Sequence, residues 1–203
     1  MYPKMERCEL WDTTKAYLKG KPSDQVMQKS TNSDYYGGNV LKGGVGTTPS
    51  GWKTPGTLFG GALDDTRYLV ASGIYQDQAD QAARDKGPPF HNIVDKGFKG
   101  EATALSQYGG QTQEAPSFRR RSSLSFTPFE AVRTTNVAHK RGRNERVVWG
   151  PRSFGFVQNG VENNEIPYLV DLIWHNIVYQ CNFIFLPPNR EHCTDWGRPI
   201  DDK

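Results

Sequence analysis

The sequence is short of the residues that build a large hydrophobic core. Only 35% of its 203 residues are hydrophobic, below the roughly 45–50% of ordinary globular chains, even allowing for scales that also count glycine. Glycine and proline, which interrupt helices and strands, occur 21 and 13 times. Aromatic residues still make up 12% of the chain, whereas disordered segments have few. We expect a mostly irregular, extended, loop-rich chain with a few short helices and no large independent core.

Several kinds of functional site are also missing. Its three cysteines, Cys8, Cys181 and Cys193, are too few and too widely spaced for a disulfide framework, which favours a reducing compartment. Of the potential zinc ligands His175, Cys181, His192 and Cys193, only the last two are close in sequence. These two are adjacent, whereas structural zinc sites use pairs separated by a few residues, such as Cys-x₂-Cys. The sequence contains no Gly-x-Ser-x-Gly nucleophile elbow and no phosphate loop ending in Gly-Lys-Ser/Thr. We therefore expect no enzyme activity, no cofactor and no metal.

Long hydrophobic runs are rare, and the one near the C-terminus, residues 166–186, is interrupted. Asp171 and four other polar residues lie within it, and Pro167 lies near its start. An aspartate at the centre of a membrane span costs about 3 kcal/mol. We therefore expect a buried helix or a pair of strands there. The first residues of the chain contain no apolar region typical of a secretory signal.

Two stretches have the spacing of amphipathic helices. In residues 6–18, Leu10, Trp11, Thr14 and Leu18 would share one helical face. The second stretch, residues 72–86, makes the better helix.

The limits of the helix at residues 72–86 follow from capping rules. Ser72 would cap its start, Lys86 lies in its last turn, and Gly87 suits the C′ position before two prolines.

Glycine pairs predict turns through much of the remaining chain. Residues 33–61 contain nine glycines and are interpreted as extended loop, and residues 128–160 as a basic loop. The expected organisation has three parts: an N-terminal short helix and linker (residues 1–30), an extended glycine- and proline-rich strap with a helix near 74–86 (residues 31–160), and an apolar C-terminal segment (residues 161–203).

Positive charge is concentrated in the middle of the chain. Residues 119–152, here called the basic segment, contain nine arginines and lysines against two glutamates, a net charge of +7 in a chain whose total is +3. Such a segment favours an acidic partner surface. Its RRRSSLS run also predicts phosphorylation by a basophilic kinase at Ser122 or Ser123, which would weaken an electrostatic contact.

Residues 128–137, PFEAVRTTNV, resemble a short segment near the C-terminal end of cilia- and flagella-associated protein ninety-six. In that family a proline, an apolar residue and a glutamate lead through a small and an aliphatic residue to a Thr-x-Asn-Val ending. The matching positions are Pro128, Phe129, Glu130, Ala131, Val132, Thr135, Asn136 and Val137. The Gly-Thr-Leu-Phe-Gly turn at residues 56–60 precedes an alanine-rich helix and a Lys-Gly-Pro-Pro-Phe exit at residues 86–90. It is similar to the Gly-Thr-aromatic-Gly turn of that family, which also precedes a helix and a Lys-Gly-x-Pro-Phe exit. The resemblance covers about residues 50–140.

The resemblance implies a non-enzymatic structural protein of the cytoplasmic cytoskeleton, in the axoneme of a cilium or flagellum. It would bind and stabilise doublet microtubules, with α/β-tubulin and other axonemal proteins as partners. Tubulin is acidic and would attract the basic segment, while aromatic rings would act as apolar anchors. The aromatic anchors would be Tyr35, Tyr36, Trp52, Phe59, Phe90 and Phe98. The other expected contacts are Arg119, Arg120, Arg121, Pro128, Phe129, Glu130, Thr135, Asn136, Lys140, Arg141, Arg143 and Arg146.

Two other classes of function stay open. A nucleic-acid-binding or ribosome-associated protein would place the basic segment on phosphates, but the rest of the chain is acidic, with a net charge of 3 − 7 = −4, and no nucleic-acid-binding motif is present. An accessory subunit of an organellar membrane complex would use residues 166–186 as an anchor, which Asp171 disfavours. Nucleic acid is therefore not the favoured partner, and a membrane span is not the favoured structure of residues 166–186.

Overall fold

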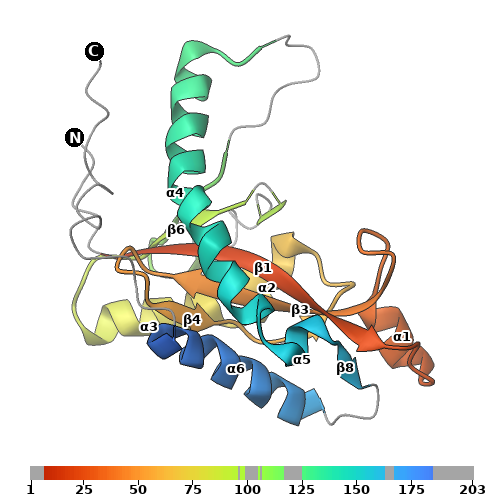
Figure 1. Ribbon diagram of the computed structural model, residues 1–203. Coiled ribbons are helices and arrows are strands. Elements are labelled where there is room, and N and C mark those ends of the chain that lie inside the picture. The colour runs from red at the N-terminus through yellow and green to blue at the C-terminus, as the bar shows by residue number, and fades with distance from the viewer. Residues whose placement is uncertain are drawn as a thin grey trace.

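A curved sheet organises the chain. The computed structural model describes residues 7–95, 97–98, 105, 107–116, 125–162 and 167–184 (Figure 1). In these residues, eight strands form a mixed sheet that curves into a half-barrel, and the content is about 26% strand and 45% helix. The prediction of a loop-rich chain without a large core is therefore wrong.

Two long antiparallel strands form the centre of the sheet. β1 (Cys8–Lys19) pairs with β3 (Gly38–Thr47), with Leu10 opposite Thr47 and Tyr17 opposite Val40. On its other side β1 runs parallel to β6, and β6 runs parallel to β7, which gives the order β2-β3-β1-β6-β7. β4 and β5 pair with β3, and β8 pairs with β1. The bounds of the shorter strands are β2 (Asn32–Ser33), β4 (Lys53–Pro55), β5 (Phe59–Gly60), β6 (His91–Val94), β7 (Thr112–Glu114) and β8 (Val161–Glu162).

Helices cover both faces of the sheet. One face packs on α2 and α3, in a cluster that contains Trp11, Tyr68, Leu69 and Tyr75. The other face packs on α4, α5 and α6, in a cluster that contains Ala16, Leu18, Val45, Val148, Val157 and Trp174. Figure 1 shows the long helix α4 crossing β1 and rising beyond the sheet. The helices are α1 (Gln25–Thr31), α2 (Asp65–Ala71), α3 (Ile74–Arg84), α4 (Pro128–Arg152), α5 (Gly155–Gln158) and α6 (Pro167–Ile184).

The helix expected over residues 6–18 is wrong, because these residues form β1. The first four residues of β1 are all buried, and burial alternates only in the second half, where Leu18 is buried and Tyr17 and Lys19 are exposed. A strand that is covered on both faces shows a continuous apolar run instead of a period of two. The apparent helical spacing of Leu10, Trp11 and Leu18 therefore comes from two opposite faces of one strand.

The glycines of residues 33–61 do not all mark turns, because three of them lie inside β3 under aromatic rings. A Cβ atom added to Gly44 would lie 2.5 Å from Cε1 of Tyr68. Added to Gly46 it would lie 2.5 Å from Cζ2 of Trp11, and added to Gly43 it would lie 2.6 Å from Cε2 of Trp174. Glycine in a strand permits this close approach of another group to the backbone. The interpretation of residues 33–61 as extended loop is therefore wrong.

The helix predicted over residues 72–86 is present as α3, with different caps. Gly73 is its N-cap, and Ser72 is the C-cap of α2 instead. At the other end Lys86 has a φ of 49°, and the amide of Gly87 donates to the carbonyl of Ala82 over 3.0 Å. This is a Schellman motif with lysine in the left-handed position, so the glycine follows one residue later than expected.

The apolar stretch near the C-terminus forms one helix, α6, and two of its polar residues bond the backbone of residues 53–58, in and after β4. Oδ1 of Asp171 accepts a hydrogen bond from the amide of Leu58 over 2.7 Å. Oδ1 of Asn182 accepts from the amide of Lys53 over 2.7 Å, and its Nδ2 donates to the Lys53 carbonyl over 3.0 Å. These polar residues therefore dock α6 on the sheet. In the described part of the chain, no helix has the length and apolar character needed to cross a membrane.

The ring-on-glycine packing gives a prediction for stability. Gly44→Ala should lower the free energy of unfolding by about 1–3 kcal/mol, because the added methyl group would overlap the Tyr68 ring in a well-packed core. The matched control is Gly38→Ala in the same strand, where a Cβ would have no neighbour within 4 Å. Urea unfolding followed by tryptophan fluorescence measures both. Equal loss of stability in the two variants would contradict the packing argument.

Candidate partner-binding surface

The first turn of α4 is fixed by a capping box. Oγ1 of Thr127 accepts a hydrogen bond from the amide of Glu130 over 3.2 Å, and Oε2 of Glu130 accepts from the amide of Thr127 over 2.9 Å. Pro128 follows the N-cap directly, a position where its missing amide hydrogen costs nothing. The interpretation of residues 128–160 as a basic loop is therefore wrong for residues 128–152. The Thr-x-x-Glu spacing of TPFE was the sequence signal for this helix.

One side of α4 rests on the sheet. Val137 is fully buried against Cys8, Leu10 and Ile93, and Val148 is buried in the cluster around Trp174.

Two polar contacts add to this packing of α4. Nε of Arg152 donates to Oγ1 of Thr14 over 2.7 Å, and Nε of Arg133 lies 3.5 Å from Oε1 of Glu114. The described contacts of α4 with the sheet thus begin about one turn after its first residue.

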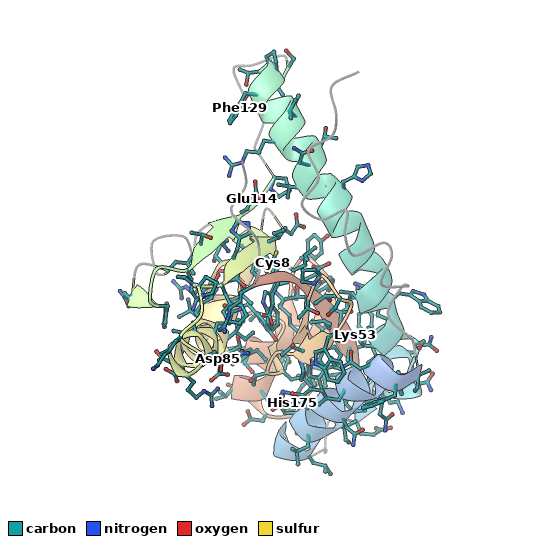
Figure 2. The ribbon with its side chains drawn as sticks, turned by 90° about the vertical axis from the view of Figure 1, so that its left-hand side faces the viewer. Cys8, Lys53, Asp85, Glu114, Phe129 and His175 are labelled. Carbon is teal, nitrogen blue, oxygen red and sulfur yellow. The ribbon has the colours of Figure 1, made fainter. Side chains whose placement is uncertain are left out.

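The start of α4 projects from the body and carries exposed apolar side chains. Phe129 and Val132 are 77% and 61% exposed. Figure 2 shows Phe129 at the tip of the helix, far from the sheet. With Asn136 and His139, these residues follow a spacing of three and four that puts them on one side of the helix. Val137, whose side chain is buried, points in another direction.

Helix α4 is basic as a whole. It contains six arginines and lysines and two glutamates, a net charge of +4. Lys140, Arg141, Arg143 and Arg146 lie in its second half, but their side chains are outside the described residues. Positions 143 and 146 continue the spacing of residues 129, 132, 136 and 139, so by sequence the projecting apolar stripe leads into basic positions. Arg119, Arg120, Arg121, Ser122 and Ser123 lie outside the described residues.

The expected aromatic anchors are not all at the surface. Tyr35 and Trp52 are 88% and 48% exposed. Tyr36 is half-buried, with the Lys15 ammonium 4.2 Å from its ring centroid. Phe59 is half-buried and packs edge-on against the ring of Tyr68.

The other two expected anchors are part of the protein's own interior. Phe90 and Phe98 are 6% and 1% exposed, and Phe98 belongs to the core cluster of Trp11 and Tyr68. Neither ring is accessible to a partner in this fold.

The structure places the exposed candidates in three separate regions. Tyr35 and Tyr36 lie in the turn between β2 and β3. The ring of Trp52 lies 6.3 Å from that of Phe183 on α6. Thr135 is exposed and Asn136 half-buried on α4, near Phe129 and the capping residue Glu130. Of these regions, only α4 combines exposed apolar residues with concentrated positive charge.

A buried polar network lies below the sheet face that α3 covers. Oε2 of Glu9 accepts hydrogen bonds from Nε2 of Gln78 over 2.8 Å and from Nε1 of Trp11 over 3.1 Å. The amide groups of Gln78 and Asn92 bond each other in both directions, and Asn92 also donates to Gln111. Burial raises the pKa of Glu9, and the hydrogen bonds from Gln78 and Trp11 offset part of this.

The partners of Glu9 indicate a structural role for the network. They are amides and an indole, and they connect β1, α3 and β6. In the described residues, no three or more His, Cys, Asp or Glu side chains form a group that could hold a metal ion.

No family model matches the chain, and no curated protein or solved structure is similar enough to it to count as a match.

The capping box gives a prediction for the projecting part of α4. Thr127→Ala should destabilise the first helical turns by about 1 kcal/mol. Because Phe129 and Val132 do not pack on the body, the loss should appear as faster amide hydrogen exchange in residues 130–133, with little change in global stability. Thr135→Ala, an exposed substitution inside the same helix, is the control and should not speed exchange. Unchanged exchange in Thr127→Ala would contradict the capping assignment.

The buried carboxyl group of Glu9 gives a prediction for pH dependence. Its pKa is raised above the ordinary value of 4.5, so the folded protein binds this proton more tightly than the unfolded chain does. The contribution of the protonated Glu9 carboxyl group to the free energy of unfolding is fully present below the unfolded-state pKa. It is lost as the pH rises through the folded-state pKa. Glu9→Gln should therefore lose less stability than the wild type between pH 4.5 and pH 8.

Urea unfolding at several pH values in that range measures this difference. Glu162→Gln, which removes a carboxylate from the surface, corrects for the change in net charge. Parallel pH profiles for wild type and Glu9→Gln would show that Glu9 is not the titrating group.

Proposed function

We propose that this chain is a non-enzymatic structural protein that binds an acidic protein lattice through helix α4, and that the lattice is the doublet microtubule of a ciliary or flagellar axoneme. The observation that carries the proposal is the projection of α4, a 25-residue helix with a net charge of +4 and an uncovered apolar tip. The resemblance at residues 128–137 includes this projecting tip, with Phe129 and Val132. The residues that carry the resemblance and the exposed apolar tip therefore belong to the same surface.

Charge and apolar contact would contribute differently to binding. The positive charge of α4 would raise the association rate with acidic tubulin, and salt would screen this contribution. Burial of Phe129, which is 77% exposed, would add about 1.5–3 kcal/mol that salt does not screen. Contacts repeated along a lattice would add to the binding through effective concentration.

The apolar tip also favours a protein partner over nucleic acid. Phosphate contacts need only positive charge, and their affinity falls steeply with salt. A phenylalanine and a valine exposed side by side on a basic helix match the apolar centre and polar rim of a protein interface. The exposed rings of Tyr35 and Trp52 are further contacts that this proposal allows.

The test is co-sedimentation of the full chain with stabilised microtubules at low and moderate salt, with RNA as a competitor. The double variant Arg143→Glu/Arg146→Glu should bind at least tenfold more weakly at low salt, which corresponds to about 1.4 kcal/mol. The double variant Phe129→Ser/Val132→Ser should lose the binding that persists at moderate salt. The matched control is Lys21→Glu/Arg84→Glu, which reverses two exposed charges outside α4 and should bind like the wild type.

Other results would reject the proposal. If the control and the α4 variants lose binding equally, α4 is not the binding helix. If RNA displaces the chain from microtubules, the basic helix serves nucleic acid. If the wild type does not bind to preformed or to co-polymerised microtubules, tubulin is not the partner.

A further inference from the structure

The outer side of α6 is an uncharged apolar surface. Leu169, Leu172, Tyr179, Phe183 and Ile184 are between 45% and 74% exposed. The positions between them on this side are Ile173, Asn176 and Gln180. None of these eight residues is charged, although charged residues make up 23% of the chain. A helix that faces water normally carries charged side chains on its outer face, so this composition is typical of a covered surface.

The surface extends beyond the helix and is hollowed. The ring of Trp52, before β4, lies 6.3 Å from that of Phe183 at an angle of 80° and lengthens the surface at the carboxyl end of α6. A groove of about 410 Å³ runs between Leu169 and Gln180, with Leu172, Ile173 and Asn176 also in its wall. An apolar side chain from a partner would fill such a groove.

We propose that this surface, α6 with Trp52, binds the same surface of a second copy of the chain in a two-fold symmetric dimer with antiparallel α6 helices. Asn176 lies at the centre of the surface, seven residues from both Leu169 and Phe183. Leu172 and Tyr179 lie on one flank of this surface, and Ile173 and Gln180 lie on the other. A two-fold axis at Asn176 brings Leu169 to the partner's Phe183 and Leu172 to the partner's Tyr179. Both of these contacts join an aliphatic side chain to an aromatic one, and Ile173 meets the partner's Gln180 on the other flank. Each contact occurs twice, as an isologous interface requires.

The residue at the two-fold axis is chemically suited to that position. A group on the axis meets an identical group, so a charged side chain there would meet a like charge. An asparagine amide both donates and accepts hydrogen bonds, so two copies can satisfy each other. The side chain of Asn176 is exposed in the single chain and is therefore accessible for this contact.

The exposed aromatic rings alone supply about a third to a half of the area that a specific dimer needs. Trp52, Tyr179 and Phe183 are 48%, 45% and 74% exposed, and a whole aromatic side chain buries about 150–250 Å². Their exposed parts therefore supply roughly 250–400 Å². A standard interface buries about 800 Å² from each partner, and the exposed parts of Leu169, Leu172, Ile184 and the groove residues supply further area.

The dimer does not depend on the proposed function, because α6 and α4 are different surfaces. The first measurement is the mass of the full chain by sedimentation equilibrium at 1–100 μM. The wild type should dimerise, and Leu172→Glu should raise the dimer dissociation constant at least tenfold. The control is Phe129→Glu, which places the same charge on an exposed aromatic position of α4 and should dimerise like the wild type. Circular dichroism confirms that each variant is folded.

Cysteine cross-linking tests the orientation. In a Cys193→Ser background, the other two cysteines, Cys8 and Cys181, are buried. Asn176→Cys should form a disulfide-linked dimer on mild oxidation, because two copies meet at the axis within the distance that a disulfide spans. Leu169→Cys should not link to itself, but a mixture of Leu169→Cys and Phe183→Cys should form mixed dimers.

Three results would overturn the proposal. A monomer at 100 μM would show that a second copy does not cover the surface. A dimer that Leu172→Glu leaves intact would place the interface elsewhere. Self-linking of Leu169→Cys would show that the helices are parallel or that the two-fold axis lies elsewhere on α6.

Discussion

Contact between aromatic rings and the glycine backbone of β3 is the interaction on which the rest of the structure depends. Trp11 and Tyr68 lie against one side of the strand, at Gly46 and Gly44, and Trp174 lies against the other side at Gly43. The polar edge of each ring is also held: Nε1 of Trp11 donates to Glu9, Nε1 of Trp174 to the Gly56 carbonyl, and the Tyr68 hydroxyl to the Thr57 carbonyl. Three glycine positions of one strand thus fix β1, α2 and α6. Since each ring buries about 150–250 Å², a chain with only 35% hydrophobic residues can still build a core.

The same packing explains why polar residues lie inside apolar elements. The ring of Trp174 lies close to the backbone of β3, so α6 also lies close to the polar main-chain groups of residues 53–58. Buried main-chain groups need hydrogen-bond partners. Asp171 and Asn182 supply them, at Leu58 and Lys53. On the opposite face the amides of Gln78, Asn92 and Gln111 share one buried network with Glu9. The polar groups of the interior are therefore paired between elements, which fixes how the helices sit on the sheet.

Local sequence signals predicted part of this fold and missed the part that depends on tertiary contact. Helix α3 has a clear end signal, and it is present. The capping box at Thr127 was equally local, but α4 has no continuous apolar stripe because its first turns leave the body, so periodicity did not indicate a helix. β1 has neither a helical nor an alternating pattern throughout, because both of its faces are covered. The glycines of β3 resemble turn glycines, because the rings that require them come from distant residues. The burial of Phe90 and Phe98 was hidden for the same reason, since one aromatic residue in an irregular stretch does not show on which side of the surface it lies.

The two uncovered helical surfaces differ in chemistry, and this difference separates the roles proposed for them. Helix α4 is basic and projects, so it suits an acidic partner that long-range attraction can bring close. The outer side of α6 has no charge, so it gains nothing from such attraction and is stabilised only by removal of apolar area from water. A dimer through α6 would leave both copies of α4 available, because Phe129 and Val132 lie on a different helix. Two linked α4 helices on a repeating lattice would bind more tightly than one, because the second contact is intramolecular. Self-association through the apolar helix would therefore strengthen lattice binding through the basic one, although the two surfaces share no residue.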